Sequence, residues 1–397
     1  MKITILGGVL AGAMLYAGAA FAGPQMTFGP EDKGVLQLDY KGQFQMIVRD
    51  IGSGTNNDNT TSNFNFRRNR LALMGAYGDN MSMYVQTEFT EDPNVGTLRV
   101  ANTNQGTEFQ MLDAVMRFKF DDALRVNVGK FKYNFSRENL EACEMPLTLD
   151  RSLLIRAPFV TTRDMGVAVW GNAFKDMFQY RLDVMEGRKA TSGDTAPDSS
   201  FRYTMRGHVS LLDPENDYGY KGTYMGKKKV LTVGTAYQFE PNVAYSNTLT
   251  KTGAKDYTAW TVDAFFEYPI STFGTATLSG AYAKYDLDNA YQGANPDSGT
   301  IGLNGEKNGY YMKAGYMLPS LPLQLFVRYE KWSFANLDGV YDQRIDWYGG
   351  GANYYFRDQN LKLTMEVNQT GFHKGTGTTV DGTKDFMTVV TQLQLIF

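Results

Sequence analysis

The sequence predicts an all-β protein, a sixteen-stranded antiparallel transmembrane β-barrel whose third outer loop folds into the lumen. Three observations lead to this prediction. Apolar and polar side chains alternate in about sixteen segments, as expected of strands with one face on lipid and one on a polar interior. The connections between these segments alternate between long and short. The last segment ends on an aromatic residue, Phe397.

Residues 1–22 have the pattern of an export signal. Lys2 forms a short positive region, residues 3 to 19 are apolar or small, and Ala20-Phe21-Ala22 matches a signal-peptidase site. The alternative, an uncleaved membrane anchor, fits the Gly/Ala-rich run and the cleavage pattern less well. We therefore expect a signal peptide over 1–22, a short N-terminal segment over 23–33 and the barrel over 34–397. Export and a barrel together predict the outer membrane of a Gram-negative cell.

The alternating segments follow one another to the end of the chain. They cover residues 36–48, 64–77, 81–89, 112–120, 124–128, 165–169, 178–184, 201–209, 231–239, 260–268, 275–285, 308–317, 323–330, 344–356, 361–367 and 387–397. The first, Leu36 to Val48, exceeds the roughly 5–6 residues of a typical globular strand and is long enough to cross a bilayer at a tilt.

Long connections are expected on the outer side and short turns on the periplasmic side, as in outer-membrane barrels. The long ones cover 50–63, 91–107, 132–163, 187–200, 240–256, 285–307, 333–343 and 369–384. The connection over 212–228 is an exception, because it is long although it falls on the short side. Strand geometry does not explain it.

Alternation also suits a soluble β-sandwich, which buries its apolar face. The even number of segments favours the barrel instead, as does a group of aromatic side chains near the short turns. These side chains suit the girdle at a membrane interface. They are Tyr77, Phe120, Phe178, Tyr268, Tyr316, Tyr354 and Phe356.

The stretch over 132–163 does not alternate and is the third long connection. It contains two prolines, the only cysteine, Cys143, and charges of both signs. Structureless connections of this length are usually disordered or functional, and its many apolar side chains argue against disorder. We therefore expect a constriction loop. Its bases Arg137, Arg151, Arg156 and Arg163 and its acids Glu138, Glu141, Glu144 and Asp150 nearly balance, which predicts weak selectivity.

Four motifs carry a family resemblance: FRRNRL at 66–71, GKFKYNFSRE at 129–138, RDMGV at 163–167 and GTYMGKK at 222–228. They resemble the phosphate-selective porin O and P family, and the match is spread over almost the whole chain after the signal. The resemblance implies a sixteen-stranded porin, usually a homotrimer, in outer-membrane lipid. It also makes 132–163 the third loop that folds inward in such porins.

The inward phase of the strands carries an excess of basic side chains, although the formal net charge is −3. One interpretation is a mixed wall whose charges pair across strands. The other is a pore that favours anions, since rings of Arg and Lys select them. Because the Debye length is about 8 Å at physiological ionic strength, wall charges discriminate strongly only where a loop narrows the channel. The predicted pore-lining bases are Lys41, Arg68, Arg70, Arg117, Lys119, Arg125, Arg181, Arg202, Arg206 and Arg328.

Composition and motifs argue against several function classes. The acidic balance does not suit nucleic-acid binding, and one cysteine cannot form an internal disulfide. The sequence has no catalytic, haem-attachment or phosphate-loop motif. We therefore expect no enzyme activity, no cofactor and no metal site. His208 is interpreted as a polar lining residue and Cys143 as a packed small side chain.

The leading hypothesis is an outer-membrane porin for passive diffusion of small hydrophilic solutes or ions, with a mild preference for anions such as phosphate or other oxyanions. The alternative is a barrel sheath in an electron conduit, around a partner such as a periplasmic multihaem cytochrome. That partner would supply the haem sites that the chain lacks. An inward loop argues against the sheath, because it would occupy the space that the partner needs.

Overall fold

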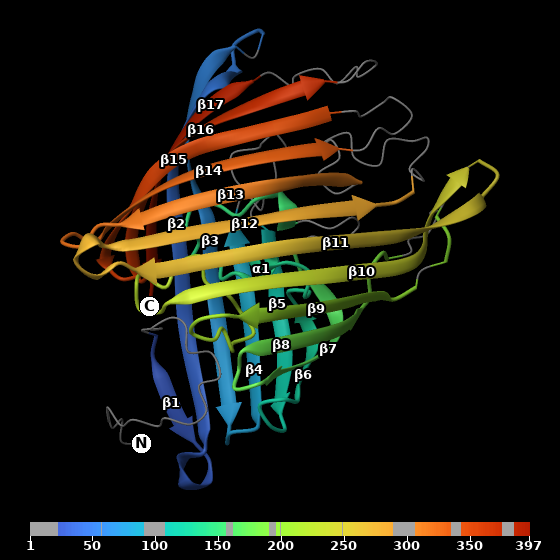
Figure 1. Cartoon of the computed structure of the whole chain (residues 1–397), viewed down its shortest axis with the longest axis vertical. Coiled ribbons are helices and arrows are strands. Elements are labelled where there is room, and N and C mark those ends of the chain that lie inside the picture. Colours follow the sequence, from blue (N-terminus) through green and yellow to red (C-terminus); the bar gives the residue numbers. More distant parts are fainter. Residues whose placement is uncertain are drawn as a thin grey trace.

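The computed structural model describes residues 23–56, 58–90, 108–155, 162–189, 196–198, 200–247, 249–288, 306–334, 343–374 and 385–397. Strands β2 to β17 form one closed antiparallel barrel, in which each strand pairs with its neighbours in the chain and β17 pairs with β2 (Figure 1). The sixteen-stranded antiparallel barrel that the sequence predicts is therefore confirmed.

The barrel strands have the following bounds. The first eight are β2 (Gly34–Ser53), β3 (Asn59–Tyr77), β4 (Met81–Thr90), β5 (Glu108–Lys119), β6 (Arg125–Phe131), β7 (Asp164–Ala173), β8 (Phe178–Met185) and β9 (Arg202–Ser210). The second eight are β10 (Val230–Asn247), β11 (Thr252–Pro269), β12 (Thr275–Asp286), β13 (Lys307–Met317), β14 (Leu323–Phe334), β15 (Gln343–Arg357), β16 (Leu361–Lys374) and β17 (Phe386–Ile396).

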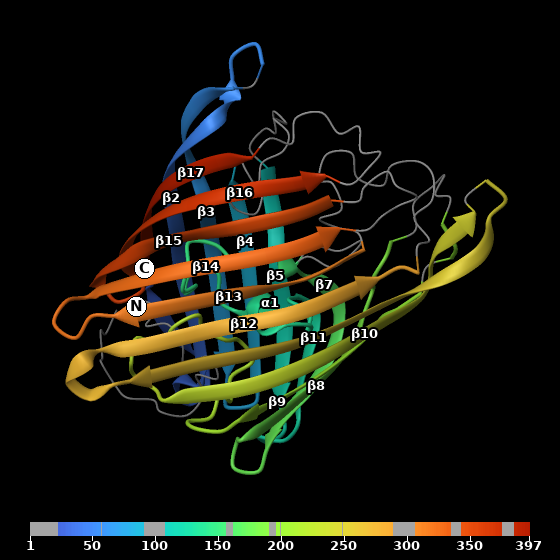
Figure 2. The same cartoon turned by 45° about the horizontal axis from the view of Figure 1, so that its top comes forward.

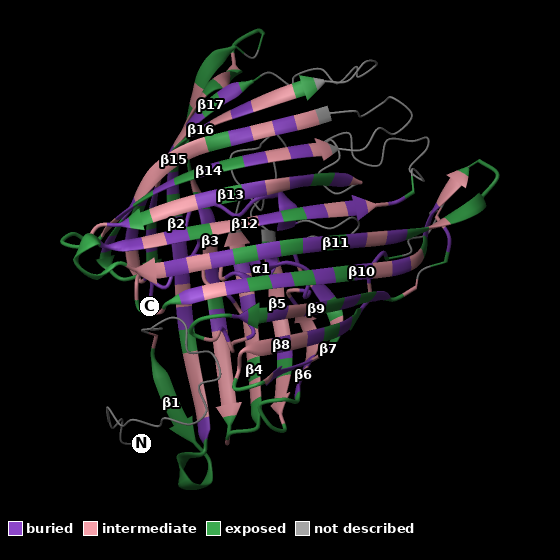
Figure 3. Cartoon of the chain, viewed as in Figure 1, coloured by how far each residue is buried: buried purple, intermediate pink, exposed green. Residues whose placement is uncertain are grey.

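Burial alternates residue by residue along most strands, as Figure 3 shows for β10 to β12. On β9, for example, Arg202, Thr204 and Arg206 are buried while Tyr203 and Met205 are exposed. Period-two side-chain placement puts the polar residues inside and the apolar ones outside. This inversion of the soluble pattern suits a wall surrounded by lipid.

Two stretches predicted as loops are instead paired strand. Residues 50–53, 59–63, 240–247 and 252–256 continue as the ends of β2–β3 and β10–β11, with register up to Ser53↔Asn59 and Asn247↔Thr252. Both hairpins project beyond the rim (Figure 2). Outside the membrane both faces of a strand are wet, so hydrophobic alternation fades although the backbone ladder continues. The predicted outer connection at 91–107 lies outside the described residues, as do residues 289–305, 335–342 and 375–384 of the predicted connections at 285–307, 333–343 and 369–384.

The N-terminal segment over 23–33 contains strand β1 (Gln25–Phe28) and the 3-10 turn η1 (Pro30–Asp32). β1 pairs with the first residues of β2, from Gln25↔Gln37 to Phe28↔Gly34. It lies along the same edge of β2 that pairs with β17 from Lys41 onward. The other short elements are α1 (Arg137–Leu140), η2 (Leu153–Ile155) and η3 (Ser271–Phe273). Among the described residues, no helix is long and apolar enough to cross a membrane.

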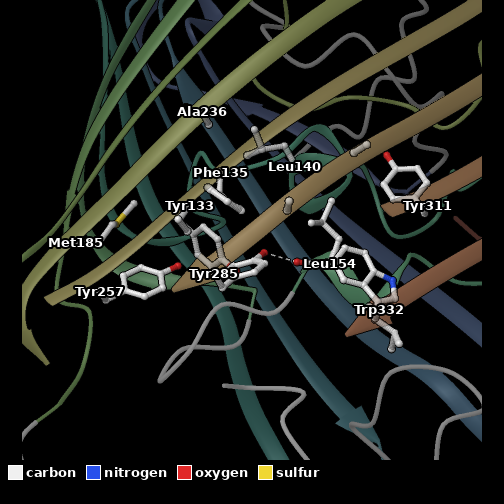
Figure 4. Packing of buried hydrophobic residues seen from close by; sticks show 14 of the residues in the cluster. Tyr133, Phe135, Leu140, Leu154, Met185, Ala236, Tyr257, Tyr285, Tyr311 and Trp332 are labelled. Carbon is white, nitrogen blue, oxygen red and sulfur yellow. Dashed lines mark hydrogen bonds between the residues drawn. The ribbon is translucent and has the colours of Figure 1, made fainter. Parts of the chain in front are cut away.

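The largest cluster of buried hydrophobic residues lies inside the barrel. Tyr133, Phe135 and Leu154, which follow β6, pack with inward-facing Tyr285 and Trp332 from the wall (Figure 4). The Tyr285 hydroxyl donates a hydrogen bond to the Leu154 carbonyl. Apolar side chains from the β6–β7 connection therefore anchor it firmly to one side of the wall.

Candidate functional site

The β6–β7 segment (132–155) binds side chains that point inward from strands around the barrel. Its wall partners are Arg67 on β3 with Asp150, Asp263 on β11 with the Arg137 N–H, Lys313 on β13 with Glu138, and Glu366 on β16 with the Leu149 N–H. Strands β3 and β11 lie half-way round the barrel from each other. Partners on both strands place the segment across the interior.

The β9–β10 connection (211–229) packs against the same segment. The Ala142 N–H donates to the Tyr220 carbonyl, and the Gly222 N–H donates to the Met145 carbonyl, both at 2.9 Å. Gly222 permits this approach because a Cβ there would lie 2.5 Å from the Leu147 nitrogen. Since β6 and β9 run in opposite directions, the two connections enter from opposite rims and meet inside.

Most of the predicted pore-lining bases form ion pairs. Eight of the ten have a carboxylate partner: Lys41 with Glu144, Arg68 with Asp150, Arg70 with Glu88, Lys119 and Arg125 with Asp122, Arg202 with Glu240, Arg206 with Asp263, and Arg328 with Glu330 and Glu366. Arg117 lies over the Tyr84 ring, and Arg181 over the rings of Tyr218 and Tyr220. The wall therefore balances most of its own charge.

The charged residues predicted for the constriction loop are also bonded. Their partners are Glu215 for Arg137, Lys313 for Glu138, the Asn139 carbonyl for Arg151 and Asp113 for Arg163. Arg156 lies outside the described residues. These contacts fix the segment in place, because each of these four charges finds an opposite charge or a carbonyl in the interior.

A cavity of about 190 Å³ remains between strands β2 to β6 and the two inward connections. Six basic side chains line it: Lys41, Arg70, Arg117, Lys132, Arg163 and Lys221. Three acidic side chains line it as well: Asp113, Glu144 and Asp217. The cavity therefore carries an excess of positive charge that the rest of the described wall does not.

Lys132 and Lys221 contribute to this excess. Among the described residues, neither has a carboxylate within salt-bridge distance, and the Lys132 ammonium donates to the Glu141 carbonyl. Burial lowers the pKa of Lys132 to about 7, and the cations Arg151 and Arg163 act in the same direction. An anion at the ammonium would oppose this shift by stabilising the charged form.

Cys143 lines the same cavity and is buried. Burial alone would raise the pKa of its thiol, but Arg151, Lys132 and Arg70 hold this pKa well below its usual value. His208 faces the interior on β9. It is buried and bonded, with Nδ1 at 2.6 Å from the Tyr220 hydroxyl.

Sequence reasoning missed Arg67, Lys132 and Lys221 as interior charges. Arg67 points inward beside Arg68 because a bulge interrupts the pairing of β3 with β2 at Gln43. Alternation gives no signal for such a bulge. The two lysines lie on connections, where alternation carries no information, and the basic run near 221–229 was the available hint.

Comparison with known sequences identifies a family. A sequence model described as "Phosphate-selective porin O and P" matches residues 38–397. An uncharacterized protein of Aquifex aeolicus (strain VF5) is 24% identical over 364 residues, which cover 84% of this chain and 81% of that protein.

Solved structures with the same fold share little sequence. OmpF of Salmonella typhi, solved with daunomycin, superimposes with a TM-score of 0.60 at 13% identity and covers 93% of this chain and 100% of its own. An anion-selective porin from Comamonas acidovorans gives a TM-score of 0.56 at 10% identity, with 92% and 100% coverage. At these identities the likeness concerns the fold alone.

Proposed function

The chain belongs to the phosphate-selective porin O and P family, and on this basis we propose that it forms an outer-membrane channel through which small hydrophilic solutes and ions diffuse passively, anions more readily than cations. Phosphate and other oxyanions are the expected anions. The observation that carries the anion preference is the cavity lined by six basic and three acidic side chains. Arg and Lys around a narrow passage favour anions.

The narrowness of the cavity gives these charges their effect. In a wide lumen, charges further than about 8 Å from the axis are screened at physiological salt. The β6–β7 segment is proposed as the constriction, because it brings Lys132 into the interior. Only Lys132 and Lys221 lack a carboxylate among the cavity's described ammonium groups, so the expected preference is mild.

Planar-bilayer recordings of the purified chain test this proposal. In a salt gradient the reversal potential should indicate a mild anion preference, and Lys132→Met and Lys221→Met should each reduce it. Lys189→Met removes a positive charge from an exposed position away from the cavity and is the matched control. Channels that prefer cations, a complete lack of channels, or an equal effect of the control would contradict the proposal.

The sequence features and the family resemblance also support proposals about export and assembly. We propose cleavage of the signal after Ala22 and assembly as a homotrimer in outer-membrane lipid. Sequencing of the mature N-terminus and light scattering of the detergent-solubilised protein test these points. A sheath around a multihaem cytochrome would need interior space that the two inward connections occupy, so their packing supports the porin over the sheath.

A further inference from the structure

The cavity beside β2 to β6 is apolar as well as cationic. Alongside its six bases it is lined by Met74, Phe131, Leu140, Met145, Tyr218 and Ile396. Phe131, Leu140 and Met145 are at most 5% exposed, so these apolar side chains are packed away from solvent at the edge of the cavity. A passage for fully hydrated inorganic ions does not need such a surface.

An inorganic oxyanion and an organic carboxylate differ in how they fit this lining. Phosphate carries polar oxygens on every side, and the atoms of Phe131, Leu140 and Met145 can give it no hydrogen bonds. Desolvating a charged oxygen without a partner is costly. An organic carboxylate has polar oxygens at one end only, and its apolar body gains from contact with apolar side chains.

The size of the cavity suits a small ring or a short chain. A dry protein cavity of roughly 150 Å³ accommodates a benzene molecule, and this one measures about 190 Å³. Three of the cavity's bases already have carboxylate partners, Lys41 with Glu144, Arg70 with Glu88 and Arg163 with Asp113. Lys132 and Lys221 have none among the described residues, and Lys132, which directly follows the apolar lining residue Phe131 in the chain, is the one we assign to a ligand's carboxylate.

We propose that this cavity binds small organic carboxylates, with the carboxylate at Lys132 and an aromatic or short aliphatic body against Phe131, Leu140 and Met145. The inference deepens the proposed anion preference and rests on it. It narrows the solute class from anions in general to monoanions that have an apolar part.

Single-channel recordings in chloride, with the unaltered chain in a planar bilayer, test the inference. Benzoate, acetate, inorganic phosphate and the neutral isostere benzamide are each titrated until the current halves. Benzoate should act at a concentration about tenfold or more below acetate, since the ring adds buried apolar area. It should also act well below phosphate, and benzamide should have little effect. Phosphate that acts at the same concentration as benzoate, or below it, would overturn the inference.

Two variants test the contacts of the ligand's carboxylate and of its apolar body separately. Lys132→Met should remove the advantage of benzoate over benzamide. Met145→Gln should remove the advantage of benzoate over acetate, and Met145→Leu, which conserves volume, should keep it. If neither variant folds, equilibrium dialysis of labelled benzoate and phosphate against the unaltered protein in detergent decides, and stronger retention of phosphate overturns the inference.

Reversal potentials measured on the same channels distinguish the two proposals. An anion preference without selective block by benzoate overturns the carboxylate site and leaves the proposed porin intact. Channels without any anion preference overturn both.

Discussion

Arg137 and Glu215 form a bidentate ion pair in the interior of the barrel, with nitrogen–oxygen distances of 2.5 and 2.7 Å. Arg137 lies on the β6–β7 segment and Glu215 on the β9–β10 connection, which enter from opposite rims. Both side chains are at most 2% exposed, and the Arg137 guanidinium also lies 3.9 Å from the centre of the Phe265 ring. The pair therefore joins the two connections and fixes them to β11.

Removing one partner of this pair should lower the stability of the folded protein. Glu215→Ala leaves a buried guanidinium without its carboxylate, and such losses amount to about 3–5 kcal/mol of stability. We expect faster proteolysis within 132–155 and a lower midpoint of urea unfolding. The double variant Arg137→Met with Glu215→Met removes both charges and should recover most of the loss. A double variant as unstable as Glu215→Ala would show that packing, and not charge pairing, holds the two connections together.

The wall of the barrel could be predicted from the sequence because its signal is local. Lys41, Gln43 and Gln45 on β2 alternate with Gly42, Phe44 and Met46, and the first three are buried as expected. Lipid on one side and polar interior on the other impose the same two-residue period on every strand. Sixteen repeats of a weak local pattern are enough to define the fold.

The interior could be predicted only in part, because its contacts join residues far apart in the chain. Alternation places both Arg206 and Asp263 on inward faces, but it does not show that the two pair with each other, at 2.7 Å. The β9–β10 connection has no periodic pattern, and its contact with Met145 depends on the three-dimensional path of both segments. The count of inward bases alone therefore does not give the field in the interior.

The anion preference should fall as pH rises through about 7. Burial lowers the pKa of Lys132 to about 7, so the ammonium is mostly charged below this pH and mostly neutral above it. The charged groups that act on Lys132 are Cys143, Arg151, Arg163 and Glu144. Reversal potentials recorded one pH unit on either side of this value should show the change, and Lys132→Met should weaken it.

Glu141 provides the control for this pH dependence. Burial raises the pKa of its carboxyl to about 7 as well, so it also gains negative charge as pH rises. Glu141→Gln should keep a residual dependence that arises from Lys132. A flat profile in Glu141→Gln, with full dependence in Lys132→Met, would assign the effect to the carboxyl instead.

Phe397 should matter more for assembly than for conductance. Its N–H donates to the Tyr40 carbonyl at 3.1 Å and its carbonyl accepts from the Tyr40 N–H at 2.6 Å, and the two rings lie 5.3 Å apart. Deleting Phe397 loses these contacts where β17 meets β2, at a cost of about 1–3 kcal/mol. The folded fraction, measured by heat-modifiable migration in gels, should fall, whereas Phe397→Tyr should behave as the unaltered chain. Normal folded levels in the deletion variant would contradict the prediction.

Excising Glu138–Leu154 should widen the channel and weaken its selectivity. The excision removes the partners of Arg67, Lys313 and Glu366 and the bulk of the material that crosses the interior. Single-channel conductance should rise severalfold, because the path is wider. Selectivity should weaken, because the wall charges then lie further than about a Debye length from the axis. Leu249→Ser, at a 95% exposed position on the β10–β11 hairpin tip, is a control that should leave conductance unchanged. Leu153 and Leu154 also fill an apolar cluster, so heat-modifiable migration must first show that the barrel still folds. A folded deletion variant with unchanged conductance would mean that the β6–β7 segment is not the constriction and that the narrowest point lies elsewhere in the barrel.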